Sequence, residues 1–203
     1  PNPDSPTGVV FSPTDIERII SAADKVGALM LIDEAYHPLY QWTACPLINK
    51  YTNLIVVRSF SKAWGAAGIR VGYSIANKKL TNFLHKQRPM YEIGNVSAQV
   101  IVNLLNHESD MLESVKRVRE GQEYFQAEMK KIGFPTYTSY GNFFHIKFGR
   151  YANKVHEILE GKIYYRKNFS EKCLKGYSRL SATTKERFEP IVASIKYLVS
   201  QSK

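Results

Sequence analysis

The segment Arg58-Ser59-Phe60-Ser61-Lys62-Ala63-Trp64-Gly65-Ala66-Ala67-Gly68-Ile69-Arg70 decides how the chain is interpreted. It follows the apolar run Leu54–Val57, which is typical of a buried strand. A lysine just after a core strand is expected to be partly desolvated, and desolvation makes its amine a better nucleophile. Ser59, Ser61 and Arg70 supply hydroxyl and guanidinium donors of the kind that hold a phosphate group.

A phosphate anchor beside a reactive lysine is the arrangement that a pyridoxal 5'-phosphate (PLP) Schiff base requires. The alternative at this point is an exposed loop with a solvated lysine, because short motifs of this kind also occur by chance.

Composition places the chain among ordinary globular proteins. It has 203 residues, of which 44% are hydrophobic and 23% charged, and no apolar run is long enough to cross a membrane. The net charge is +10, but the basic residues are scattered, so nucleic acid is not favoured and steering of a small anionic substrate explains the charge as well. Two cysteines, Cys45 and Cys173, predict no disulfide framework and a cytoplasmic setting, and no metal-ligand spacing is visible.

The first half of the chain predicts an α/β fold. Ser12-Pro13-Thr14-Asp15 begins a helix that stops at Gly27, and Ala28–Ile32 is typical of a parallel strand covered on both faces. Further strands are expected at 54–57 and 70–76. We therefore expect a mostly parallel sheet with helices on both faces, whose ligand lies beyond the carboxyl ends of the strands, where Asp33 and Lys62 stand.

Two further helices are expected in the first part of the chain, at 78–87 and 96–106. The second part predicts a small α+β domain, with helices at 109–131 and 152–159 and a capping box at Thr183–Glu186 that begins the last helix. Strands are expected at 143–148, with one face exposed to solvent, and at 162–166 and 177–182. The predicted boundary divides the chain into residues 1–108 and 109–203, the second part including the long connecting helix.

Other polar residues have chemical roles if PLP is the ligand. Asp33 is suited to keep the pyridine nitrogen protonated, and Tyr36 to donate to the ring oxygen; the alternatives are a strand-end cap and a packing ring. Arg179 lies in an apolar strand and needs a carboxylate partner, either a substrate or a structural glutamate. Arg166 raises the same question, and Asn142 is either a contact in a cleft or part of a turn.

Four ordered motifs carry a family resemblance that covers the whole chain. They are Pro3-Asp4-Ser5-Pro6-Thr7-Gly8, Asp33-Glu34-Ala35-Tyr36, Ser59-Phe60-Ser61-Lys62 with Arg70-Val71-Gly72-Tyr73, and Arg179. The chain resembles the fold-type I PLP-dependent aminotransferases of class I/II, and within them the histidinol-phosphate aminotransferase branch.

The resemblance implies a role for each matched residue. It makes Lys62 the Schiff-base lysine, Asp33 and Tyr36 the partners of the ring, and Ser59, Ser61 and Arg70 the phosphate ligands. It further makes Arg179 the clamp of the substrate α-carboxylate and Arg166 a contact of the substrate's own phosphate, with Asn142 as a further substrate contact.

Two departures from the family bear on function. Ser5 stands where the family usually has an asparagine that reaches the ring oxygen, and a serine is shorter. In the family a long N-terminal part precedes the proline-rich loop and completes the cofactor pocket, and the enzymes are homodimers. The chain starts at Pro1 without a methionine, so we expect a C-terminal part of a longer protein that alone binds PLP poorly and lacks activity.

The predicted function is therefore amino-group transfer between an amino acid and a 2-oxo acid through a Lys62 Schiff base. Arg166 either binds the phosphate of a phosphorylated amino acid or pairs with Glu160 or Glu171. Fold-type I proteins share these motifs across reactions. Decarboxylation of a phosphorylated amino acid and a non-catalytic PLP-sensing domain therefore remain as alternatives.

Overall fold

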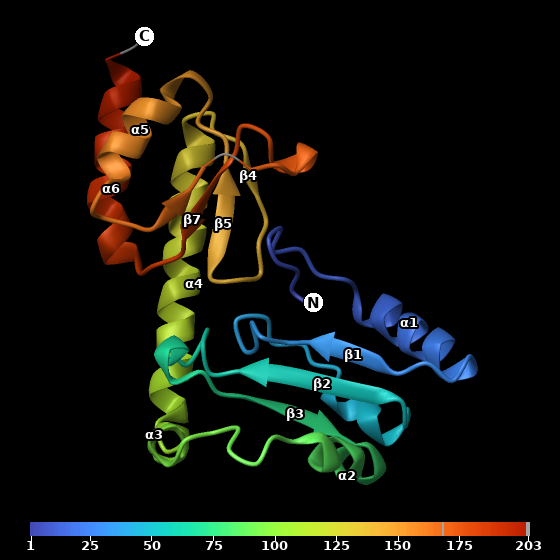
Figure 1. Ribbon diagram of the computed structural model, residues 1–203. Coiled ribbons are helices and arrows are strands. Elements are labelled where there is room, and N and C mark those ends of the chain that lie inside the picture. The colour runs from blue at the N-terminus through green and yellow to red at the C-terminus, as the bar shows by residue number, and fades with distance from the viewer. Residues whose placement is uncertain (168, 202–203) are drawn as a thin grey trace. The chain divides into compact units, whose positions relative to one another are not determined.

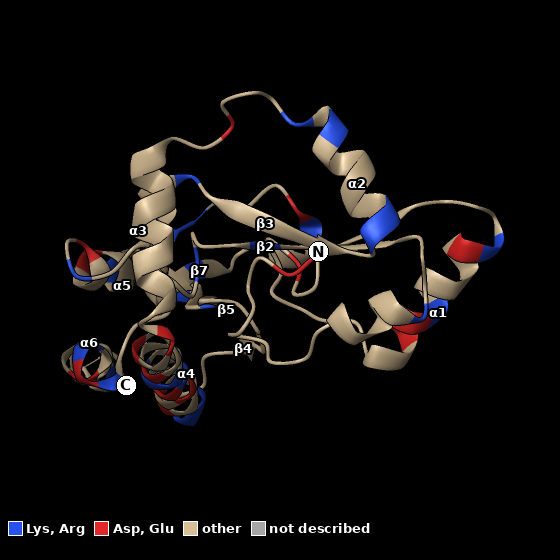
Figure 2. Cartoon of the chain, turned by 90° about the horizontal axis from the view of Figure 1, so that it is seen from below, with Lys and Arg blue, Asp and Glu red and all other residues tan. Residues whose placement is uncertain are grey.

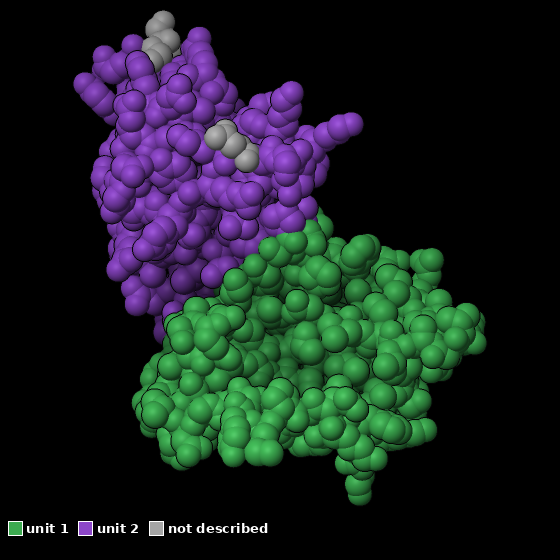
Figure 3. All heavy atoms as spheres, viewed as in Figure 1, with its two compact units in different colours: residues 1–5, 9–112 green, residues 6–8, 113–203 purple. Residues whose placement is uncertain are grey.

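The computed structural model describes residues 1–167 and 169–201, and Figure 1 labels most of their helices and strands. The chain divides into two compact units, coloured in Figure 3: residues 1–5 and 9–112 form unit 1, and residues 6–8 with those from 113 onward form unit 2. Their assignment to the large and small domains of a PLP enzyme, with a boundary at 108/109, stays a prediction.

Unit 1 begins with the predicted helix α1 (Pro13–Lys25). The Ser12 hydroxyl accepts a hydrogen bond from the Asp15 N–H at 3.1 Å, which caps the helix as expected. The helix ends before Gly27, whose φ of 68° is in the left-handed region that glycine adopts without strain.

The sheet of unit 1 is mixed rather than mostly parallel. Its order is β1 (Met30–Asp33), β2 (Leu54–Ser59) and β3 (Gly72–Ala76); β1 and β2 are parallel, whereas β2 and β3 are antiparallel. The segment 60–71 contains only the short 3-10 helix η2 (Ala67–Ile69). Without a crossover helix the chain turns back beside β2, so β3 runs in the opposite direction.

Only one face of β1 is covered within this chain. Ile16 and Ile20 of α1 pack with Ile32, Leu54 and further apolar residues into one core. Leu31 points to the other face and is 54% exposed, so the prediction of a strand covered on both faces is wrong for β1.

Unit 1 also contains the 3-10 helix η1 (Cys45–Asn49) and the helices α2 (Lys78–Gln87) and α3 (Asn95–Leu105), close to their predicted bounds. The long helix α4 (Glu108–Lys131) follows, and the boundary between the units falls within it. Basic and acidic residues are interleaved along α1 and α4, whereas α2 carries only basic ones (Figure 2). None of the helices in the described part of the chain has both the length and the apolar character needed to cross a membrane.

Unit 2 is built on an antiparallel sheet of order β4-β5-β7-β6. The strands are β4 (Thr136–Tyr137), β5 (Phe143–Ile146), β6 (Tyr165–Arg166) and β7 (Ser178–Ser181), and the further helices are α5 (Ala152–Leu159) and α6 (Lys185–Ser200). The two-residue β4 was not predicted. Residues of α4, α5 and α6 pack with Phe144, Ile146 and Leu180 into a core on one face of this sheet.

Two predictions for unit 2 need correction. All four residues of β5 are buried, so neither face of this strand is exposed to solvent; Arg179 and Phe169 lie against Phe143 and His145 on the face opposite the core. The N-cap of α6 is Thr184 rather than Thr183, and its side chain makes no capping hydrogen bond.

Gly121 of α4 shows how closely the helix approaches the β7–α6 connection. A Cβ atom at this position would overlap the backbone carbonyl oxygen of Thr183. We expect Gly121→Ala to destabilise unit 2 by about 1–3 kcal/mol, because backbone must move to admit the methyl group. Gly94→Ala is the control, since a Cβ there meets nothing within 4 Å. Urea unfolding of both variants measures the difference in the free energy of unfolding. Equal stability would show that the backbone near Thr183 moves away from α4 at little cost.

Candidate active site

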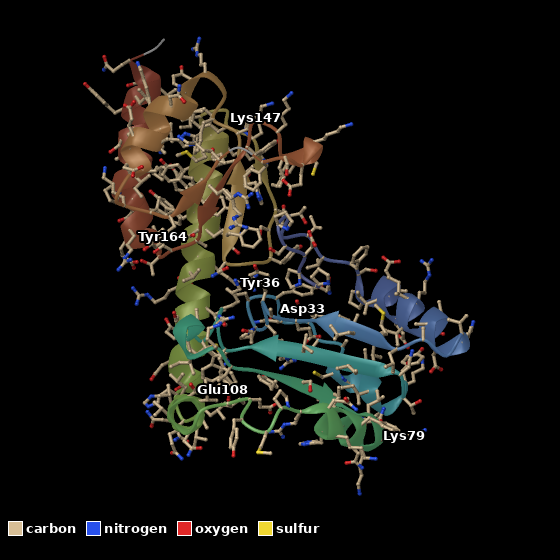
Figure 4. The ribbon with its side chains drawn as sticks, in the orientation of Figure 1. Asp33, Tyr36, Lys79, Glu108, Lys147 and Tyr164 are labelled. Carbon is tan, nitrogen blue, oxygen red and sulfur yellow. The ribbon has the colours of Figure 1, made fainter. Side chains whose placement is uncertain are left out.

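The candidate site lies at one edge of the unit 1 sheet. Asp33 is the last residue of β1 and Ser59 the last residue of β2. Because these strands are parallel, their carboxyl ends meet at the same edge. Figure 4 labels Asp33 at the end of β1 and Tyr36 in the loop that follows it directly.

Lys62 extends from the loop after β2 toward the loop after β1. Its Nζ atom lies 5.3 Å from the centre of the Tyr36 ring, which is 7% exposed. The Lys62 side chain itself is exposed, so the expected partial desolvation is not found in this chain. Among the described residues, the Tyr36 ring lies against the Lys62 amine, and no carboxylate lies within 4.0 Å of that amine.

The lysine loop is anchored by Phe60. This residue is 5% exposed, and its ring packs against Trp64 at 5.6 Å and Tyr73 at 5.5 Å between centroids. The Phe60 N–H donates to the Val71 carbonyl at 3.2 Å, and the Phe60 carbonyl accepts from the Ala66 N–H at 2.9 Å. These bonds close the loop at its base, so Lys62 is held on a structured turn.

Hydroxyl and guanidinium donors surround the loop. The Ser59 Oγ accepts a hydrogen bond from the Ser61 N–H at 3.0 Å, which leaves the Ser59 hydroxyl proton available to a ligand. Arg70 follows η2 with φ 60° and ψ 38°, and its Nη1 donates to the Ala67 carbonyl at 3.1 Å. A left-handed conformation costs a non-glycine residue about 1–2 kcal/mol, and such strain concentrates at ligand-binding positions.

Asp33 is oriented by the chain that follows it and by the N-terminal segment. Its Oδ1 accepts from the Ala35 N–H at 2.9 Å, and its backbone carbonyl accepts from the Asn2 N–H at 2.8 Å. The second bond holds residues 1–5 along the end of β1, so Ser5 belongs to the same unit as Asp33. Ser5 is exposed.

A buried ion pair supports this edge of the sheet, and it was not predicted from the sequence. Glu34, 1% exposed, accepts from Arg58 at 3.0 Å, from the Ala44 N–H at 2.6 Å and from the Thr43 hydroxyl at 2.8 Å. Arg58 also donates to the Thr43 hydroxyl. Glu34 follows Asp33 and Arg58 precedes Ser59, so the pair fixes both loops of the site. An arginine at the end of an apolar strand was the signal that could have revealed it.

Two pKa shifts accompany this network. Burial lowers the pKa of His37, the nearby Arg58 lowers it further, and Glu34 opposes both. Burial also works against the charge of Arg58, but the hydrogen bond with Tyr73 and the neighbouring Cys45 and Glu34 outweigh it, so the pKa of Arg58 lies above its ordinary value. At neutral pH the network therefore holds one cation, Arg58, against Glu34.

The three predicted substrate residues belong to unit 2. The Arg179 guanidinium lies 5.0 Å from the Phe143 ring centre and that of Arg166 lies 4.9 Å from the Phe169 ring centre. Within the described ranges neither arginine has a carboxylate within 4.0 Å. Asn142 accepts a backbone hydrogen bond from the Ala182 N–H at 2.9 Å at the end of β7.

The alternative partners of Arg166 are otherwise engaged. Glu160 accepts from the Tyr165 hydroxyl at 2.9 Å, and Glu171 accepts from the Ser170 hydroxyl at 3.3 Å. Among the described residues, neither of these carboxylates lies within 4.0 Å of the Arg166 guanidinium.

The donor set of unit 1 fits PLP. The ligand needs an amine for its aldehyde, a carboxylate for its pyridine nitrogen, a phenol for its ring oxygen, and hydroxyl and guanidinium donors for its phosphate. One sheet edge offers all of these, in Lys62, Asp33 and Tyr36 with Ser59, Ser61 and Arg70. Their assignment to individual atoms of the cofactor stays a prediction.

Comparisons with known proteins agree with this interpretation of the donor set. A family profile described as "Aminotransferase class I and II" matches residues 1–195. A histidinol-phosphate aminotransferase of Caldanaerobacter subterraneus subsp. tengcongensis is 33% identical over 201 residues, covering 98% of this chain and 56% of the relative. The chain spans about half the length of the curated relatives it matches.

Two solved structures share the fold. The histidinol-phosphate aminotransferase from Sinorhizobium meliloti in complex with pyridoxal-5'-phosphate matches with a TM-score of 0.76 and 22% identity, covering 100% of this chain and 56% of that one. The L-threonine-O-3-phosphate decarboxylase from Porphyromonas gingivalis matches with a TM-score of 0.77 and 20% identity, covering 98% and 63%. The family indicates PLP as the cofactor.

Proposed function

Because the chain belongs to the aminotransferase class I and II family, we propose that its protein transfers an amino group from an amino acid to a 2-oxo acid with PLP as cofactor. The observation that carries the proposal is the Lys62 amine, which lies over the Tyr36 ring at the sheet edge where Asp33 ends β1. The amine is exposed, its loop is held in a defined conformation, and it has no described ion-pair partner, so it is available to react as a nucleophile.

When bound, PLP supplies an aldehyde and an electron-withdrawing ring. Lys62 would hold the cofactor through its amine and would move a proton to and from the substrate α-carbon. Asp33, oriented by the Ala35 N–H, would keep the pyridine nitrogen protonated, and the Tyr36 hydroxyl would donate to the ring oxygen. Ser59, Ser61 and Arg70 would bind the phosphate, and Ser5 would take the place of the asparagine that the family usually has there.

The substrate side of the proposal rests on unit 2. We assign the substrate α-carboxylate to Arg179 and a phosphate group of the amino donor to Arg166, with Asn142 as a polar contact. The absence of a carboxylate within 4.0 Å of either guanidinium, within the described ranges, supports a role in binding anions. A phosphorylated donor resembling histidinol phosphate is the substrate class that follows.

Product analysis tests the proposal. The full-length protein that contains this chain is loaded with PLP and offered L-histidinol phosphate and a panel of phosphorylated and plain amino acids, each with and without a 2-oxo acid. We expect amino-group transfer that depends on the 2-oxo acid and favours phosphorylated donors. Release of carbon dioxide without that requirement would identify a decarboxylase instead. No turnover with any donor, despite bound PLP, would favour a PLP-sensing domain.

We also propose that the protein acts as a homodimer. Helix α3 is largely apolar, yet Ile101 is its one buried residue, whereas Val96, Val102 and Leu105 are 79%, 60% and 53% exposed. Exposed apolar surface of this kind is typical of an interface. A cytoplasmic location stays the prediction made from the cysteine content.

The dimer proposal predicts that Val102→Asp converts the dimer into a monomer, because a carboxylate buried in the interface would lack a partner. Light scattering during gel filtration measures the molecular mass that distinguishes the two states. Tyr197→Asp is the control, since Tyr197 is 68% exposed on α6 of unit 2. A wild-type chain that is monomeric at high concentration would contradict the proposal.

A further inference from the structure

Within the described part of the chain, unit 2 has a hollow at the β6 edge of its sheet. It encloses about 790 Å³, a volume within the range of small-molecule sites. Its lining residues come from the connection between α5 and β6, from β6 and the residue after it, from the end of β7 and from the first turn of α6. None of the described residues assigned above to the cofactor or the substrate is among them, so the hollow is a separate candidate site.

Part of the hollow is apolar and held in place by the core of unit 2. Ile163, Tyr165 and Ala182 line it, and all three are partly buried against that core. The Tyr164 carbonyl accepts a hydrogen bond from the Ser181 N–H at 2.9 Å, which ties the wall from β6 to the wall from β7. A surface that is already ordered loses little conformational freedom when a ligand binds to it.

The rim of the hollow carries an excess of positive charge. Lys162, Lys167 and Arg187 line the hollow and are exposed, and Glu160 is the one acidic residue among its described lining. The Glu160 carboxylate already accepts a hydrogen bond from the Tyr165 hydroxyl at 2.9 Å. Three cations against one anion leave two positive charges in excess. A cleft lined mainly by one sign of charge concentrates ions of the opposite sign.

The carboxylates of α6 do not neutralise this charge. Glu186 pairs with Arg117 at 3.6 Å, and Glu189 with Lys185 at 3.9 Å. Among the described residues, no carboxylate lies within 4.0 Å of any of the three rim cations. Their ammonium and guanidinium groups therefore keep donors for an anionic ligand.

An aromatic side chain and two hydroxyl groups complete the rim. Tyr164, labelled in Figure 4, is 88% exposed, and its ring is a surface on which a planar group can stack. Ser181 and Thr183 also line the hollow and supply hydroxyl groups. Hydroxyl, ammonium and guanidinium donors together are the groups that hold a phosphate.

We propose that this hollow binds an organic phosphate, with a planar ring on its apolar part and a dianionic phosphate among Lys162, Lys167 and Arg187. The two positive charges in excess match the charge of a phosphate monoester. Nucleoside monophosphates are the ligand class with both features. The inference goes beyond the proposed function and does not rest on it, because the hollow uses none of the residues assigned to amino-group transfer.

Three probes separate the ring from the charge. Calorimetry measures the binding of adenosine 5'-monophosphate, adenosine and inorganic phosphate to the full-length protein that contains this chain, with PLP bound so that the cofactor site is filled. We expect the monophosphate to bind more tightly than either of the other two, because burial of the ring and pairing of the charge both contribute. Its affinity should fall as the salt concentration rises.

Four variants place the probe on the molecule. Arg187→Met and Lys162→Met should each weaken binding of the monophosphate by about tenfold, since each removes a charge-assisted contact. Lys154→Met removes an exposed lysine of α5 that does not line the hollow, and Arg166→Met removes a proposed substrate contact; both should bind within about threefold of wild type. Thermal unfolding establishes that all four variants fold.

Other outcomes overturn the inference. Adenosine that binds as tightly as the monophosphate would mean that the rim cations recognise no charge, and inorganic phosphate that does so would mean that the apolar part holds no ring. An equal loss in Lys154→Met would mean a general effect of net charge, and an equal loss in Arg166→Met would place the probe at the substrate arginines. A protein that does not bind the monophosphate would also contradict it. Because no turnover is measured, failure of the amino-transfer assay leaves this result independent.

Discussion

Replacing Lys62 by alanine is expected to reduce amino-group transfer by about a thousandfold or more, since one side chain both holds the cofactor and moves the substrate proton. The absorbance band that PLP develops near the visible edge on binding should disappear in Lys62→Ala. Reduction of the wild-type full-length protein with borohydride should attach the cofactor to the peptide that contains Lys62, where mass spectrometry detects it.

Two further variants make this result specific. Lys62→Arg keeps the positive charge but has no amine that can condense with an aldehyde, so it should be as inactive as Lys62→Ala. Lys79→Ala removes an exposed lysine of α2 in the same unit and should keep full activity. Attachment of the cofactor to any other lysine, or substantial activity in Lys62→Arg, would sink the assignment of Lys62.

The second large effect concerns stability. Arg58→Met leaves the Glu34 carboxylate, 1% exposed, without its cation and should lower the free energy of unfolding of unit 1 by about 3–5 kcal/mol. The double variant Arg58→Met with Glu34→Leu should lose less than Arg58→Met alone, because no isolated charge is then buried. Urea unfolding of the single and double variants measures this coupling.

Arg18→Met is the matched control for the loss of an arginine. Arg18 pairs with Asp15 at 3.1 Å, but their side chains are 78% and 47% exposed, so the expected loss is below about 1 kcal/mol. If Arg58→Met were as stable as Arg18→Met, the buried pair would not hold the two loops of the site.

Most local signals of the sequence were reliable, although the capping box expected at Thr183–Glu186 was not. The Ser12 cap and the bounds of α2 follow from hydrogen bonding and helical spacing within one segment. The direction of β3 does not follow from any signal within one segment, because it depends on whether the chain after β2 crosses over or turns back. β4 was missed since two residues carry no periodic pattern.

The candidate site, like the fold, was predicted only in part. Asp33 and Lys62 were correctly expected at the carboxyl ends of strands, because strand ends are visible in an apolar run. The exposure of Lys62 was not correctly expected, because it depends on which other segments cover the loop. The Glu34–Arg58 pair joins residues 24 positions apart, and nothing in either segment alone names the other as its partner.

The assignment of Pro6–Gly8 to unit 2 has a consequence for any attempt to take the chain apart. The Gly8 carbonyl accepts from the Tyr140 N–H at 2.8 Å, while residues 1–5 and 9–112 belong to unit 1. A protease that cuts α4 once, between residues 112 and 113, therefore severs the polypeptide without releasing a complete unit 2. A truncation that begins at residue 113 lacks the segment that pairs with Tyr140. Separate expression of the two units calls for a circularly permuted or grafted segment rather than a simple choice of end points.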